Sequence, residues 1–327
     1  MIRNSEFHSR HSHSFVNLCR DITKLKITNM HIVKYRKIFY AISVILMIGS
    51  IVSIAVWGLN PGIDFKGGAA LEVEYTKNVP TQDTIQASLA PLNLDASVRP
   101  IGNNGYLVKT KSISDSERQS MEDVLAKEDG FSVKQFSSIG PVLGAEAMRK
   151  SFASIALVLL CIVLFVTFAF RHVSEPVASW KYGLITVFAL SHDVLVPAGV
   201  FAFLGHFQGV EIDTLFVTAL LVVLGFSVHD TIVVFDRVRE NLRISKDERD
   251  KKDFEQIVGE SINQTFVRSI NTSLTTLLAL VVLYIFGGEA TRMFSLALLI
   301  GITAGTYSSV FLGSPLLVTV EKMQKSK

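Results

Sequence analysis

The sequence predicts an α-helical membrane protein with six transmembrane helices and one extracytoplasmic α+β domain between the first and the second. Three observations support this fold class. Charged residues make up 19% of the 327 residues and the mean hydropathy is +0.39, whereas soluble proteins are about a quarter charged. Six apolar runs each approach the ~20 residues that a bilayer helix needs. A long polar region, residues 59–150, separates the first two runs.

The six apolar runs follow a basic N-terminal tail of residues 1–37. They lie at about 38–58, 152–170, 183–204, 213–235, 269–286 and 293–318. The last five form a membrane domain, 151–320, and a second tail follows at 321–327. Within this domain the charged stretch 237–267 has apolar residues between polar ones, which predicts an amphipathic helix along the cytoplasmic surface.

Lysine and arginine gather in alternate loops. Both tails and the loops after the second and fourth runs are rich in them, whereas 205–211 has none and 287–292 has only Arg292. Short cytoplasmic loops carry this excess in membrane proteins. We therefore expect both termini in the cytoplasm, residues 59–150 outside it, and the cell (inner) membrane as the location.

The polar region reads as alternating strands and helices. The expected order is a strand at 69–75, a helix at 82–89, strands at 96–101 and 106–111, a helix from about 115 to 127 and a strand at 131–136. Ser114 and Glu117 have the spacing of a capping box, and Gly130 ends the second helix. The order β-α-β-β-α-β is that of a ferredoxin-like domain. It contains no catalytic constellation, so a docking or substrate-contacting module is expected.

The sequence offers little for metal or redox chemistry. Cys19 lies in the tail and Cys161 in an apolar run, which argues against a disulfide or a cysteine metal site. His8, His11 and His13 lie close together in the tail, where a solvated segment is favoured over a metal site. We expect no metal and no cofactor, with protons as the coupling ion.

Several motifs resemble the SecF branch of the SecD/SecF family of protein-translocase subunits, within the RND superfamily. They cover about 35–320 and occur in the expected order. The motif residues are Gly62, Asp64, Phe65, Gly67 and Gly68 outside the first helix, Gly140, Pro141 and Gly144 before the second, Asp230, Asp236, Arg237 and Arg239 on the fourth, and Arg268 and Asn271 on the fifth. His229 stands where that pattern has an asparagine.

The resemblance implies a non-enzymatic subunit that works with SecD, beside the SecYEG channel and often with YajC. Such a complex would use the proton motive force to assist the late stage of preprotein translocation. The proton-coupling residues of the family correspond to Asp230 and Arg268. No nucleic-acid partner is implied.

Asp230 is also conspicuous from the residues alone. It lies about 26 Å into the fourth run at 1.5 Å per residue, towards the cytoplasmic side, and an ionisable residue within a spanning helix usually marks a pathway or a buried pair. Arg268 is expected near the same level. A neighbouring guanidinium would hold Asp230 ionised, and its departure would allow protonation. The alternative is a permanent pair that fixes helix packing.

A second His-Asp pair, His192 and Asp193, lies in the middle of the third run. It could pass protons towards Asp230 or hydrogen-bond across helices, and His229 adds another titratable group. A metal hydrolase with two His-Asp pairs needs further ligands that the sequence does not supply.

Gly301 and Gly305 have the G-x-x-x-G spacing of close helix packing. The glycines at 62, 67 and 68, with Asp64, are predicted to shape a tight junction.

Two other functions remain open from the sequence. One is a subunit of an RND-type small-molecule or lipid exporter, although residues 59–150 are few for a drug-binding pocket. The other is a non-conducting structural subunit of a translocase, in which a partner carries the protons.

Overall fold

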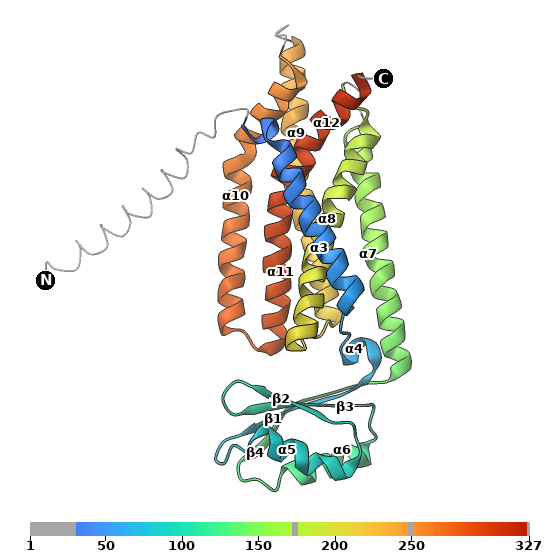
Figure 1. Cartoon of the computed structure of the whole chain (residues 1–327), viewed down its shortest axis with the longest axis vertical. Coiled ribbons are helices and arrows are strands. Elements are labelled where there is room, and N and C mark those ends of the chain that lie inside the picture. The colour runs from blue at the N-terminus through green and yellow to red at the C-terminus, as the bar shows by residue number, and fades with distance from the viewer. Residues whose placement is uncertain (1–30, 172–175, 248–251, 326–327) are drawn as a thin grey trace, which may run out of the picture.

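The computed structural model describes residues 31–171, 176–247 and 252–325. Figure 1 shows long helices side by side, with a small sheet domain at one end of the bundle and the C-terminal end of the chain at the other. Six helical segments of the described chain are long and apolar enough to cross a membrane, which confirms the predicted fold class.

Each membrane helix extends beyond its apolar run at one end or at both. Their bounds are α3 Arg36–Trp57, α7 Pro141–Ala169, α8 Ser179–Gln208, α9 Thr214–Asp247, α10 Phe254–Phe286 and α11 Glu289–Tyr307, and the last continues through the π-helical segment η2 Ser308–Gly313 into α12 Ser314–Lys325. A short helix, α2 His31–Lys34, precedes α3. Buried residues concentrate in α8, α9 and the α11–α12 segment, so these form the centre of the bundle.

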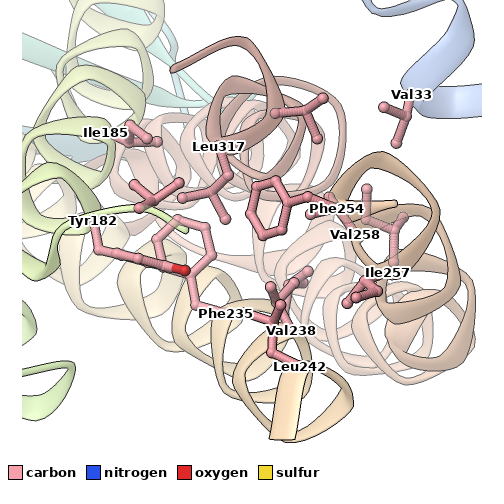
Figure 2. Close-up of a cluster of buried hydrophobic side chains, with 14 of the residues drawn as sticks. Val33, Tyr182, Ile185, Phe235, Val238, Leu242, Phe254, Ile257, Val258 and Leu317 are labelled. Atoms are coloured by element: carbon pink, nitrogen blue, oxygen red, sulfur yellow. The ribbon is translucent and has the colours of Figure 1, made fainter. Parts of the chain in front are cut away.

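The charged stretch 237–267 is not one helix along the surface. Its first part continues α9 to Asp247 and its last part opens α10 at Phe254. The apolar residues of both parts pack together in one buried cluster with Tyr182, Phe235 and Leu317 (Figure 2). This burial explains the difference: the amphipathic pattern reflects a face that packs on protein rather than on lipid headgroups.

The sheet domain has the predicted β-α-β-β-α-β order. Its elements are β1 Gly68–Tyr75, α5 Gln82–Leu89, the short 3-10 turn η1 Ala90–Leu92, β2 Ser97–Ile101, β3 Gly105–Thr110, α6 Asp115–Leu125 and β4 Phe131–Ile139. All strand pairs are antiparallel in the order β2-β3-β1-β4. In Figure 1 the sheet lies between its two helices and the membrane bundle. The domain core packs Leu71, Val73 and Val108 against Leu89 and Leu125.

The junction between bundle and sheet domain is tight, as the glycine motif predicts. The short helix α4 Ile63–Lys66 ends at Gly67, whose φ of 79° favours glycine. A Cβ on Gly67 would lie 2.7 Å from the Pro141 Cα, and one on Gly144 would lie 2.9 Å from the Gly67 nitrogen. Larger residues would force α4 and the start of α7 apart.

Candidate functional site: two buried carboxylates in the bundle

Asp230 lies on the inner face of α9 and is 7% exposed. Its Oδ1 accepts a hydrogen bond from the Ser269 hydroxyl of α10. Its Oδ2 accepts one from the Ser309 hydroxyl of η2 at 2.5 Å. The carboxylate is thus held by neutral donors from two other elements.

Asp193, on α8, forms a second buried carboxylate site. Its Oδ1 lies 2.9 Å from Nδ1 of the adjacent His192, and both side chains are fully buried. Its Oδ2 accepts hydrogen bonds from the Ser227 hydroxyl of α9 at 2.5 Å and from the Ser308 hydroxyl of η2 at 2.8 Å. The structure therefore places the His192–Asp193 pair among three helical elements.

Small residues let these elements approach one another. A Cβ on Gly305 would lie 2.9 Å from the Ser227 Cβ and 3.6 Å from the Asp193 carboxylate, and one on Gly301 would overlap Val223. The predicted G-x-x-x-G contact is thus the α9–α11 contact. It brings η2 close enough for its serines to reach both carboxylates.

Arg268 lies near the level of Asp230, as expected, because it adjoins Ser269, which donates to that carboxylate, but it does not pair with Asp230. It is exposed on α10, and no ion pair in the described chain joins it to Asp230. His229 is likewise exposed on α9, although its neighbour Asp230 is buried. Successive helical positions are about 100° apart, so the two residues of each pair take different faces: Asp230 and Ser269 face inward, His229 and Arg268 outward.

The remaining motif residues of the junction make contacts between elements. The Asp64 Oδ2 accepts from the Thr214 N–H at 2.9 Å and from its hydroxyl at 2.6 Å, so it caps the start of α9. Phe65 is buried among membrane helices, and the Gly62 N–H donates to the Ile212 carbonyl at 2.8 Å. Gly67, which follows α4, and Gly68, the first residue of β1, both have positive φ.

The polar motif at the far end of α9 forms local pairs. Asp236 pairs with Arg239, and Arg237 pairs with Glu240 at 2.5 Å and donates to Gln264 of α10 at 2.5 Å. Asn271 is exposed on α10.

Sequence reasoning missed Ser227, Ser308 and Ser309. Ser227 lies three residues before Asp230, a spacing that predicts a shared helix face. The adjacent serines 308 and 309 interrupt an apolar run, which is a weaker signal. Neither pattern predicts a π-helical segment, whose wider turn depends on packing.

No group of three or more His, Cys, Asp or Glu side chains that could hold a metal occurs in the ranges that the structure describes. His8, His11 and His13 lie outside those ranges, as does Cys19. Cys161 is exposed.

Comparison with protein families gives two matches. Residues 120–323 match the family described as protein export membrane protein SecD/SecF, C-terminal, and residues 52–79 match the SecD/SecF GG motif. The first match spans the buried carboxylates and the second spans the glycine junction.

Relatives and solved structures agree with these matches. The chain is 44% identical over 305 residues to the protein translocase subunit SecF of Thermobaculum terrenum, covering 89% of this chain and 93% of the relative. It is 39% identical to that of Anaerolinea thermophila, covering 89% and 94%. The crystal structure of SecDF from Thermus thermophilus, a translocon-associated membrane protein, matches with a TM-score of 0.78 and 30% identity over 91% of this chain. SecDF in a super-membrane-facing form matches with a TM-score of 0.63. The chain spans 39% of either SecDF chain.

Proposed function

Since this chain belongs to the SecD/SecF family of protein export membrane proteins and is an auxiliary subunit of Sec protein export, we propose that proton uptake and release at Asp230 powers its part in export. Its partner in this process is a SecD-type subunit, and the driving force is the proton motive force. The SecYEG channel, YajC and the translocating preprotein are the further expected partners. The coupling ion is the proton, and no other cofactor takes part.

The observation that carries this proposal is the environment of Asp230. A carboxylate inside a spanning helix costs ~2.5–3.5 kcal/mol on insertion scales. Its donors in the described chain are two hydroxyls, which hold the side chain without a compensating charge. Proton uptake removes the charge and leaves both hydroxyls able to reorient. Asp230 is thus suited to change its protonation state within a fixed pocket.

The exposed charge on α10 supports a partner subunit. Arg268 lies on a helix long and apolar enough to cross the membrane, and intramembrane charges face protein or water rather than lipid. We infer that the SecD-type subunit covers this face, because the SecDF chain extends well beyond the part that this chain matches.

Arg268 would act on Asp230 through Ser269. The two residues are neighbours on α10, with Arg268 outward and Ser269 donating to Asp230. A partner that pulls on Arg268 rotates or shifts this turn of α10, and so changes the hydrogen bond to Asp230. His229, on the outer face of α9, lies on the same route, and the His192–Asp193 pair extends it into the bundle.

The orientation follows from where the charges lie. The basic residues of α9 and the described C-terminal end lie at the end of the bundle opposite the sheet domain (Figure 1). By the positive-inside rule we infer that this end faces the cytoplasm, that both termini lie on that side of the membrane, and that residues 59–150 lie outside the inner membrane.

The decisive experiment compares wild type with Asp230→Asn in export by reconstituted vesicles, at matched amounts of assembled complex. We expect export to lose its dependence on the proton gradient, while assembly stays intact because the asparagine Oδ1 can still accept from one serine hydroxyl and its Nδ2 can donate to the oxygen of the other. Asp247→Asn is the control, since Asp247 lies at the exposed end of the same helix. Gradient-dependent export by Asp230→Asn would refute the proposal and favour a structural subunit.

A further inference from the structure

Two successive serines join the two buried carboxylates. Ser308 donates to Asp193 and Ser309 donates to Asp230, from the first two positions of η2. We propose that these serines couple the proton occupancy of Asp193 to that of Asp230, which makes Asp193 a second proton-holding site. This inference deepens the proposed function and rests on it.

Each serine has two acceptors within reach but a single hydroxyl proton. The Ser308 Oγ lies 2.8 Å from the Asp193 carboxylate and 3.1 Å from the Gly305 carbonyl oxygen. The Ser309 Oγ lies 2.5 Å from the Asp230 carboxylate and 3.1 Å from the Thr306 carbonyl oxygen. The two bonds of each hydroxyl are therefore alternatives.

The protonation state of the carboxylate selects between them. An ionised carboxylate accepts the hydroxyl proton. A protonated carboxyl instead donates its own proton to the serine Oγ, and the hydroxyl proton turns to the backbone carbonyl. Every donor keeps an acceptor in both states.

Both switches act on the same stretch of backbone. Serine bonds to carbonyls of the preceding turn perturb helices, and π-helical turns are frequent at functional sites. The Ser309 carbonyl also accepts from the Ser314 hydroxyl at 2.7 Å, across the π-helical turn. A proton taken up at one carboxylate therefore changes the backbone that orients the donor to the other.

The neighbouring titratable groups are few in the described chain. His192 is the group beside Asp193, and its Nε2 has no hydrogen-bond partner among the described residues. Its ring lies 6.0 Å from that of Tyr307, the residue before η2. On α9 and α10, His229 and Arg268 face away from the pocket. The coupling thus runs through hydroxyls rather than through a buried lysine or arginine.

The test is an infrared titration of carboxyl bands in the full chain, assembled with its SecD-type partner in liposomes. The Asp193→Asn and Asp230→Asn variants assign the two bands. We expect Asp230→Asn to move the titration midpoint of the Asp193 band by about tenfold in proton concentration, as for strongly interacting sites. When Ser308 and Ser309 are both replaced by alanine, Asp230→Asn should no longer move the titration midpoint of the Asp193 band. When both are replaced by threonine, which keeps the hydroxyls, the shift should return.

Ser295→Ala is the matched control, because Ser295 is a buried serine of α11 whose hydroxyl donates only to the Arg292 carbonyl among described groups. It should leave the coupling intact. An Asp193 midpoint that ignores Asp230, or an Asp193 that never titrates, overturns the inference. Neither of these results depends on export. Failure of the proposed function would be seen in a different measurement, as export that still depends on the proton gradient in Asp230→Asn.

Discussion

At the residue scale, the Asp230 carboxylate accepts hydrogen bonds from two serine hydroxyls, one on α10 and one on η2. An ion pair with arginine would hold this carboxylate charged, because an opposite charge within a few ångströms favours the ionised form. Hydroxyls can donate to a carboxylate and accept from a carboxyl, so they satisfy both states. Under the proposed function, proton uptake at this site breaks no salt bridge.

Removing one of these hydroxyls should slow coupling. Ser269→Ala takes away one of the two described donors to Asp230, and hydrogen bonds to charged groups contribute about 1.5–3 kcal/mol. We expect gradient-driven export to fall about tenfold or more at equal complex abundance. Ser151→Ala, which removes a hydroxyl bonded to the Ala147 carbonyl of α7, should leave export unchanged. Equal rates in both variants would contradict a role for the Ser269 bond.

The capping box of α6 predicts a pH dependence outside the membrane. Hydrogen bonds from the Ser114 backbone N–H and hydroxyl lower the pKa of Glu117 below its ordinary value of 4.5. A lowered pKa stabilises the fold above the unfolded value, and the contribution is lost as pH falls through the folded value.

Hydrogen exchange in the first turn of α6, corrected for intrinsic rates, should therefore lose protection as pH falls below 4.5. In Glu117→Gln this loss should be absent, because the side chain no longer titrates. An identical pH profile in the two proteins would show that Glu117 does not supply the dependence.

At the scale of the elements, close contacts between helices depend on small residues. The Ser53 hydroxyl of α3 donates to the Gly199 carbonyl of α8 at 2.7 Å, and a Cβ on Gly199 would overlap Ser50. Gly301 and Gly305 likewise allow α11 to approach α9 closely. These contacts set how α8, α9 and η2 are rotated, and so which hydroxyls reach the carboxylates.

Gly199→Ala should destabilise the bundle. Overpacking a well-packed contact costs about 1–3 kcal/mol, whereas an alanine on Gly225, with nothing within 4 Å of its Cβ, should be neutral or stabilising. Unfolding of the two variants in mixed detergent micelles measures the difference. A Gly199→Ala protein as stable as Gly225→Ala would mean that α3 shifts freely on α8.

The whole molecule is a membrane bundle with a sheet domain docked on one end. Lys109 of β3 pairs with Glu211 of the α8–α9 loop at 2.7 Å, and Arg99 of β2 donates to the Gly209 carbonyl at 2.5 Å. A cleft of about 860 Å³ lies between the sheet and the adjoining ends of the helices, and its lining includes Arg99, Lys109, Glu211, Glu72 and Arg292. The polar contacts hold the sheet over the cleft.

Breaking the ion pair should loosen the docking. Both partners are about one-fifth exposed, and a partly exposed pair contributes on the order of 1 kcal/mol. Lys109→Glu should raise hydrogen exchange in residues 209–213, and adding Glu211→Lys should restore protection. Lys111→Glu, at an exposed and longer pair with Asp95, is the control. If the charge swap fails to restore protection, the pair does not hold the domain.

Local patterns in the sequence determined the six spanning helices, the strand and helix order of the sheet domain and the Ser114 cap. These features depend on hydropathy, alternation and short spacings, which neighbouring residues set. The carboxylate Asp230 was also recognisable, because a charge within an apolar helix is costly wherever the helix packs.

Only the tertiary structure decided which groups meet these carboxylates. Arg268 and Asp230 share a predicted depth, yet the rotation of α10 about its axis turns Ser269 inward and Arg268 outward. The π-helical turn that directs Ser308 and Ser309 to different aspartates also depends on packing between helices distant in sequence. Helix rotation and register result from the sum of many side-chain contacts across the bundle, and no local pattern encodes that sum.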